Sequence, residues 1–246
     1  MRYLTKLLLK LLLSTLFEYD DERMDELLHS LTAQSTTRFF KKGTALLYQS
    51  EIPRYAFIVR KGLIRAYTIT STGEERIAAL HTPQDIFPLS WVYGETPNTL
   101  FYYEATTDCE VICVPKTMLL DAVAKNSQLQ ARLLKFVVNE YTASLIRITA
   151  LEQSTAAEKI ALTLYYLLIR HGIEQAKGEF VIDFKMTQSM LANLVGLTRE
   201  STAINLKLLH KKQIVSYSSF TYVVNKANLE RFVGEDGFKD ITLTLS

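Results

Sequence analysis

Hydrophobic and polar positions follow a different spacing in each part of the chain, and each spacing predicts a different structure. Between 36 and 118, short apolar and aromatic runs alternate with turn sequences such as EIPR, STGE and TPQD. Strands at such regular intervals predict a small barrel or jelly roll. Gly43, Gly62 and Gly73 stand where tight turns between the strands need a flexible residue.

A long segment without Gly or Pro follows, and its apolar positions predict a helix that pairs with a second helix. From 126 to 153 they recur at alternating steps of three and four residues, which is a heptad pattern. The seam consists of Leu134, Val137, Tyr141, Ser144, Ile148 and Leu151. A helix packed only on its own roll is the alternative, but the length of the seam favours dimerisation. We expect a dimerisation helix and hinge over 119–154.

Two short helical patterns joined by a glycine dominate the last part of the chain. Thr187 can cap the first helix, and apolar residues at 191, 194 and 195 share one face of it. Gly196 can end this helix in the left-handed conformation, and Thr198 can cap the next one. This pattern predicts a helix-turn-helix inside a domain spanning 155–246.

The second helix of the pair has an apolar inner face and a polar outer face. Its inward positions are Thr202, Leu206 and Leu209, whereas the N-terminal turn carries polar groups outward. Upstream, we expect a first domain helix over 161–169, a turn-rich connection in RHGIEQAKGEF and an edge strand in VIDF.

The run GLTRESTAINLKLL, followed by KKQIVSYSSFTYVV, resembles the C-terminal winged helix-turn-helix of the cyclic-AMP receptor protein/FNR family of bacterial regulators. The resemblance covers about 36–224. It implies an α+β chain with a cyclic-nucleotide-binding-like β-roll at 36–118, a dimerisation helix and a winged helix-turn-helix. It also implies a cytoplasmic homodimer that regulates transcription from a palindromic double-stranded DNA operator, with RNA polymerase as a further partner.

In this family an Arg-Glu pair at the start of the recognition helix reads base edges, and Arg199 and Glu200 occupy those positions. A guanidinium can donate two hydrogen bonds to guanine, and a carboxylate can accept one from cytosine. The family usually has another Arg one turn later, where this chain has Ile204. Isoleucine can contact a thymine methyl, so we expect an operator that departs from the usual half-site.

Phosphate contacts are expected from residues that match the family's backbone-gripping positions. These are Thr187, Ser189, Thr198, Ser201, Lys207 and Lys211, with Lys212, Ser218 and Ser219 as weaker candidates. The charge supports this assignment, because 187–226 holds five Lys/Arg against one acid whereas the whole chain is only +2. A basic module on a near-neutral protein is typical of phosphate binding.

The roll lacks the residues with which this family binds a cyclic nucleotide. After the turn PQDIF stand Pro88 and Leu89 instead of Gly-Glu, and the position of the phosphate-binding Arg falls near Thr99. A cyclic phosphate buried without a cation is poorly compensated, so cyclic AMP is not expected. A haem group would need an axial ligand, for which His81 alone is weak support.

Aromatic residues gather in the sequence where the family has its effector pocket. The candidate pocket residues are Phe87, Trp91, Tyr93, Thr99, Phe101 and Tyr103. They could hold an apolar or planar ligand of unknown identity. A roll filled by its own side chains remains an equal alternative.

The two cysteines and four histidines give no metal spacing. Cys109 and Cys113 lie four residues apart on one strand, about 13 Å at ~3.3 Å per residue, which is too far for a disulfide. An iron–sulfur cluster needs four cysteines and is not expected. No catalytic constellation or phosphate loop is present, so we do not expect an enzyme.

The opening MRYLTKLLLKLLLSTLF places Leu4, Leu8, Leu11 and Leu12 on one helical stripe. A lysine interrupts the run, and it is shorter than the roughly 20 apolar residues of a membrane span. We expect an N-terminal helical segment over 1–35. It packs on the protein or lies on a membrane or partner surface, with a signal peptide as the least favoured reading. A membrane-surface sensor is therefore the alternative function.

Overall fold

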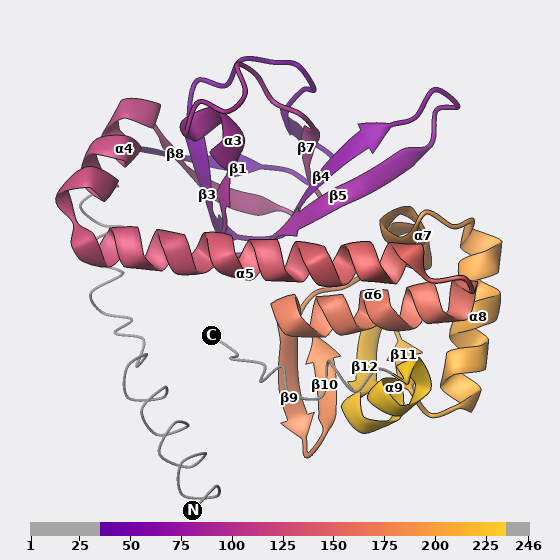
Figure 1. The fold of residues 1–246 in the computed structure, drawn as a ribbon. Coiled ribbons are helices and arrows are strands. Elements are labelled where there is room, and N and C mark those ends of the chain that lie inside the picture. The colour runs from indigo at the N-terminus through magenta and orange to yellow at the C-terminus, as the bar shows by residue number, and fades with distance from the viewer. Residues whose placement is uncertain (1–34, 235–246) are drawn as a thin grey trace, which may run out of the picture.

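The computed structural model describes residues 35–234, so the predictions for the leucine-rich N-terminal helix lie outside the described residues. A long helix, α5, runs through the middle of the molecule (Figure 1). A β-roll lies on one side of α5, and a small helical and β domain lies on the other side. Within the described part, no helix has the length and apolar character needed to cross a membrane.

The roll consists of two four-stranded antiparallel sheets. One has the order β1-β8-β3-β6, comprising β1 (Thr36–Phe40), β8 (Cys109–Val114), β3 (Ala56–Lys61) and β6 (Ile86–Phe87). The other has the order β2-β7-β4-β5, comprising β2 (Ala45–Leu47), β7 (Tyr102–Ala105), β4 (Ile64–Ile69) and β5 (Glu75–His81). Two short helices, α3 (Leu89–Val92) and α4 (Lys116–Lys125), complete this part. The predicted β-roll is confirmed.

Strands β3 and β8 are buried on both faces, which explains why they are almost continuously apolar in the sequence. Successive side chains point to opposite faces of a sheet. Thus Phe57 and Cys113 lie in the core of the roll, whereas Ile58 and Ile112 pack with Leu119 of α4 in a second cluster. Cys109 and Cys113 are both free and buried, as expected for small apolar residues.

Gly62 lies in the turn between β3 and β4. Its φ of +98° belongs to the region that side chains disfavour. A Cβ added there would lie 2.6 Å from both the carbonyl oxygen of Asp108 and the sulfur of Cys109. Glycine is therefore required at this turn by both backbone conformation and space.

Helices α5 (Ser127–Glu152) and α6 (Ala156–His171) form a hairpin. Asn126 caps α5, since its side chain accepts hydrogen bonds from the backbone N–H groups of 128 and 129. Thr155 and Glu158 form a reciprocal capping box at the start of α6. The long helix was predicted closely, but the next helix begins five residues before the predicted 161.

The region predicted as a turn-rich connection is in fact a β-hairpin. Strand β9 (Gly172–Ala176) pairs with β10 (Glu179–Ile182), and the sheet order is β11-β12-β10-β9. The prediction of an edge strand at VIDF is therefore wrong, because β10 lies between two strands and β9 is the edge. Strand β9 was not predicted because it is exposed after its first residue and its sequence shows no apolar alternation.

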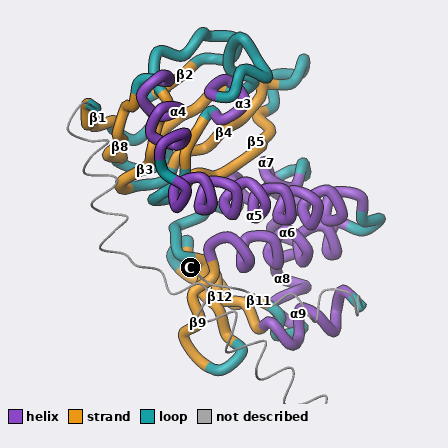
Figure 2. The backbone as a smooth tube through the Cα atoms, turned by 60° about the vertical axis from the view of Figure 1, so that its left-hand side comes forward, coloured by secondary structure: helices purple, strands orange, loops and turns teal. Residues whose placement is uncertain are grey.

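The remaining elements form the winged helix-turn-helix, and Figure 2 shows its small sheet below α6. They are α7 (Gln188–Val195), α8 (Arg199–Lys211), β11 (Val215–Ser218), β12 (Thr221–Asn225) and α9 (Lys226–Val233). Their core continues into the roll without a break. Tyr67, Ile77 and Leu80 of the roll share one hydrophobic cluster with Leu191 and Leu194 of α7.

Candidate nucleic-acid interface

Local hydrogen bonds define both helices of the helix-turn-helix. The hydroxyl oxygen of Thr187 accepts from the backbone N–H of Met190 at 3.1 Å, which caps α7. Gly196 ends α7 in the left-handed conformation with φ +78°. The hydroxyl oxygen of Thr198 accepts from the N–H of Ser201 at 3.1 Å, which caps α8. The capping residues and the glycine turn were predicted correctly.

Helix α8 has the two faces that its sequence predicts. Thr202, Leu206 and Leu209 are fully buried, and the Thr202 hydroxyl donates to the carbonyl oxygen of Thr198. Arg199 and Glu200, in the first turn of α8, are exposed, and Ile204 is 68 % exposed. The three side chains named as base readers are therefore all accessible in the N-terminal half of α8.

A cleft of about 570 Å³ opens beside this surface, between the N-terminal ends of α7 and α8 and the β11–β12 hairpin. It is lined by Thr187, Gln188, Ser189, Arg199, Tyr217, Ser218, Ser219, Phe220 and Tyr222. Backbone N–H groups at the start of a helix favour anions. The cleft thus combines two helix starts, hydroxyl groups and one guanidinium, which suits a phosphate group.

The hairpin tip that closes this cleft has an unusual backbone. Ser219 and Phe220 both have positive φ, of 49° and 69°. Such turns normally carry Asn-Gly or Asp-Gly. Here the carbonyl oxygen of Phe220 accepts a hydrogen bond from the backbone N–H of Met186 at 2.8 Å, which fixes the tip against the start of the helix-turn-helix.

The residues predicted to contact phosphate differ in how far they are exposed. Thr187, Ser189, Thr198, Lys207 and Lys211 are exposed, and Ser201 is half-buried. As capping residues, the two threonines accept a backbone hydrogen bond and still have a hydroxyl proton to donate.

Among the weaker candidates, Lys212 lies 5.2 Å from the ring centre of Phe232 of α9. Gln188, Tyr217 and Phe220 line the cleft although they were not singled out. The sequence has no glycine or asparagine at the hairpin tip, so neighbouring residues could not indicate that the tip lies beside α7.

In the roll, the six candidate effector residues do not all belong to one cluster. Phe87 stacks on Phe57 and Tyr103 at ring distances of 5.4 and 4.7 Å, and Phe101 packs against the same cluster. The ring of His81 stacks on Phe87 at 4.7 Å, and burial lowers its pKa to about 4. These side chains fill the interior of the roll.

The other three candidates lie elsewhere. Trp91 belongs to the cluster between β3, β8 and α4, where the Lys116 ammonium donates to its carbonyl oxygen at 2.8 Å. Tyr93 is exposed. The hydroxyl of Thr99 is buried and donates to the carbonyl oxygen of Tyr48 at 2.6 Å. Between residues 35 and 234, no three His, Cys, Asp or Glu side chains are placed to hold a metal ion.

The six residues of the predicted seam are all exposed on α5. Leu134 and Tyr141 are each 65 % exposed, and Ile148 is 52 % exposed. The opposite side of the helix, including Ala143, Ile146 and Ala150, is buried against the rest of the chain. One face of α5 therefore carries an apolar stripe that no residue between 35 and 234 covers.

Two sequence profiles match the chain in the places that the fold suggests. Residues 37–126 match the cyclic nucleotide-binding domain, and residues 158–232 match the Crp-like helix-turn-helix domain. Among solved structures, FixK2 from Bradyrhizobium japonicum has a TM-score of 0.66 at 24% identity, covering 80% of this chain and 96% of that one. CooA from Carboxydothermus hydrogenoformans, solved as a mutant, has a TM-score of 0.69 at 17% identity, covering 83% and 90%. Both likenesses concern the fold.

Similarity also extends along most of the sequence of known regulators. The fumarate and nitrate reduction regulatory protein of Vibrio cholerae is 27% identical over 225 residues, which cover 89% of this chain and 85% of the relative. The transcriptional activator protein FnrA of Stutzerimonas stutzeri is 30% identical over 169 residues, covering 68% and 67%. The names of these relatives describe a regulatory protein and a transcriptional activator. The chain therefore belongs to the cyclic-AMP receptor protein/FNR family, and it is a DNA-binding transcription regulator.

Proposed function

We propose that the protein acts as a homodimer that binds a two-fold symmetric operator through the outer face of α8. The exposed apolar seam of α5 carries this proposal. A soluble domain rarely leaves a long apolar stripe uncovered, and a heptad seam fits a second copy of itself. A two-fold axis along α5 would relate the two recognition helices, so that each enters one half-site about 34 Å from the other.

For the half-site, we assign base readout to Arg199, Glu200 and Ile204. Arg199 donates to guanine, Glu200 accepts from cytosine, and Ile204 contacts a thymine methyl. The exposure of all three side chains supports this assignment. Ile204 lacks any hydrogen-bonding group, so it discriminates through shape and apolar contact alone.

Phosphate contacts are assigned to the predicted residues Thr187, Ser189, Thr198, Ser201, Lys207 and Lys211. The cleft between α7, α8 and the hairpin supports a phosphate position next to Arg199. The lysines further along α8 follow the DNA backbone. Each such contact releases counterions and adds to the salt dependence of binding.

For the roll, we propose control by an effector that is not cyclic AMP. No Lys or Arg occurs from 86 to 105, and Lys116 is engaged with Trp91. The aromatic residues fill the roll, so an apolar or planar ligand has to displace rings such as Phe87 and Tyr103. Ligand entry would then move the sheets and α5 with them. We place the protein in the cytoplasm, with RNA polymerase as its further partner.

Selection of bound duplexes from a random pool tests the proposal. A homodimer selects a site with two-fold symmetry and half-sites one DNA turn apart. Light scattering on the same preparation should give twice 28.1 kDa. A monomer that enriches a single asymmetric site would contradict the homodimer. Binding that stays unchanged across a metabolite screen and on oxidation would contradict control by an effector.

A further inference from the structure

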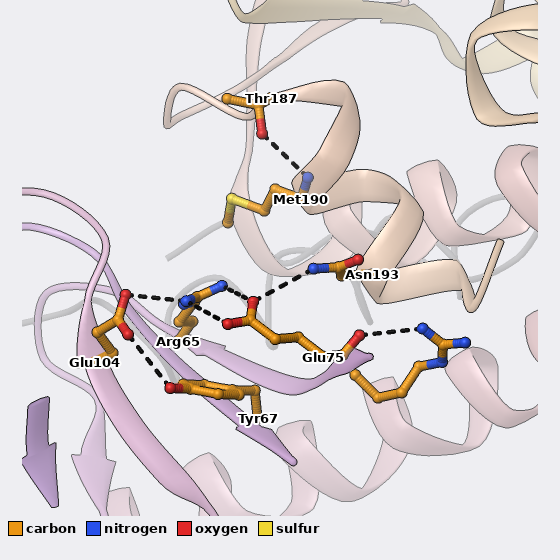
Figure 3. A network of polar contacts seen from close by, with 8 residues as sticks. Arg65, Tyr67, Glu75, Glu104, Thr187, Met190 and Asn193 are labelled. Atoms are coloured by element: carbon orange, nitrogen blue, oxygen red, sulfur yellow. Dashed lines mark hydrogen bonds and ion pairs between the residues drawn. The ribbon is translucent and has the colours of Figure 1, made fainter. Parts of the chain in front are cut away.

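The roll and the helix-turn-helix are joined by polar contacts that lie along one strand, β5. Figure 3 shows this junction near the start of β5, where the carboxylate of Glu75 faces Asn193 of α7. The Asn193 amide donates to Glu75 at 3.5 Å. Glu75 also accepts a short hydrogen bond of 2.5 Å from Arg65, which in turn binds Glu104 of β7 at 3.0 Å. The carboxylate that meets α7 is therefore held rigidly by the sheet.

Arg147 of α5 makes the central contact of this junction. Its guanidinium donates to the carbonyl oxygens of Ile77 and Ala78 in β5. It also donates to the carbonyl oxygen of Leu194 in the last turn of α7, at 3.3 Å. One side chain thus connects the dimerisation helix, the roll and the first helix of the helix-turn-helix.

The contact with α7 has a clear electrostatic reason. The last four carbonyl groups of a helix lack partners within it, and this end of the helix dipole favours a cation. Because guanidinium is planar with five donors, it can serve carbonyls on two elements at once. Apolar residues surround the contact, since Ile77 and Leu194 belong to the continuous core of roll and helix-turn-helix.

A second buried group holds the far end of β5. Arg170 of α6 forms ion pairs with Asp85, in the turn after β5, at 3.4 Å and with Glu140 of α5 at 2.5 Å. Contacts near residues 75, 78 and 85 therefore attach α7, α5 and α6 to the same strip of the roll. Attachment at several separated points resists rotation, whereas a single point would leave the helix-turn-helix free to turn.

We infer that Arg147 is a positioning residue for DNA recognition: by joining α5 and β5 to the C-terminal end of α7, it sets the spacing between half-sites that the dimer accepts. This inference rests on the proposed homodimer and its symmetric operator. One base pair changes the separation by about 3.4 Å and the rotation by about 34°. If α7 is rigidly attached, the dimer binds an operator with an altered spacing much less tightly. If α7 is loosely attached, the loss of affinity is small.

The test uses duplexes in which the selected half-site is fixed and the spacer varies by one base pair at a time. Arg147→Met retains most of the side-chain volume but removes all donors, and Arg147→Lys retains the charge. The control is Arg54→Met, which removes one positive charge from the exposed loop between β2 and β3. The measured quantity is the ratio of affinities for the best spacing and its neighbours. Binding to a duplex with a single half-site is measured in parallel.

We expect Arg147→Met to lower this ratio about tenfold, within the usual range of coupling between sites. Its dimer mass and its affinity for a single half-site should match the wild type. Arg147→Lys should recover part of the ratio, and Arg54→Met should leave it unchanged. A general loss of stability would instead lower binding to every duplex alike. A folded, dimeric Arg147→Met protein with the wild-type ratio would overturn the inference.

Asn193→Ala provides a second test that does not depend on Arg147→Met folding. It removes one contact at the partly exposed edge of the junction, and a smaller decrease in the ratio is expected. An unchanged ratio in both Asn193→Ala and Arg147→Lys also overturns the inference. If the wild type selects no symmetric site, the proposed homodimer itself fails, and the spacing inference fails with it. The two failures are therefore distinguishable.

Discussion

Replacing Ile148 by aspartate in the α5 seam should separate the proposed dimer into monomers. Ile148 is 52 % exposed in the single chain. Full burial of an isoleucine contributes about 1.5–3 kcal/mol, so covering this exposed half contributes about 1 kcal/mol per copy. By symmetry the two copies contribute about 2 kcal/mol to association.

Aspartate adds a repulsive contribution to this loss. Because the proposed two-fold axis runs along α5, residue 148 faces its own copy, and two carboxylates at roughly 6 Å repel by about 3 kcal/mol at an effective dielectric constant of 20. The total of about 5 kcal/mol raises the dimer dissociation constant more than a thousandfold. Operator affinity should fall together with dimerisation.

Sedimentation over a concentration series measures this change directly. The matched control is Thr142→Asp, which introduces the same charge on an exposed position of α5, about 120° around the helix from Ile148. Thr142→Asp should remain dimeric. If Ile148→Asp still sediments at twice 28.1 kDa and binds the operator normally, the seam is not the dimer interface. If both variants dissociate equally, the charge acts by disturbing the helix.

Four further predictions concern the DNA face and the core. Arg199→Ala should cost about 1–3 kcal/mol in operator binding and relax one base position, and a uniform loss over all sequences in a competition assay would exclude base readout. Lys207→Ala should weaken all duplexes alike and reduce the slope of log affinity against log salt by about 1. Gly62→Ala should lower the free energy of unfolding by about 2 kcal/mol or more, measured by urea denaturation, because of its positive φ and the contact with Asp108. Burial and the nearby Arg170 charge lower the pKa of His171 from 6.5 to about 3. The unfolded chain therefore binds a proton at a higher pH than the folded chain does, and the free energy of unfolding should fall as the pH decreases from 6.5 towards 3. His171→Leu should flatten this dependence of stability on pH.

Features that depend on neighbouring residues in the sequence could be predicted well. The threonine caps of α7 and α8 and the turn at Gly196 each involve groups within four residues, so the pattern contains the whole interaction. The same holds for the apolar spacing of α5. The outer face of α8 followed directly, because the positions of its buried residues determine the side that remains exposed.

Features that depend on distant segments could not be predicted in this way. The hairpin tip at Ser219 and Phe220 is supported by Met186, more than thirty residues earlier in the chain. The β9 edge strand pairs through its backbone and needs no apolar alternation. In the roll, an aromatic-rich sequence was compatible with a ligand pocket or with a filled interior, and the choice depends on packing such as that of Phe87 on Tyr103, which are far apart in the sequence.

The continuous core also bears on how this architecture can change by recombination. Tyr67, Ile77 and Leu80 lie outside the interior of the roll and pack with residues of α6 and α7. A chimaera that joins a foreign sensor to this DNA-binding part would have to match that sheet surface, and not merely provide a linker at Gln153. Diversification of the sensor is therefore constrained on the outer face of β4 and β5, while the loops at the opposite end of the roll are free to vary.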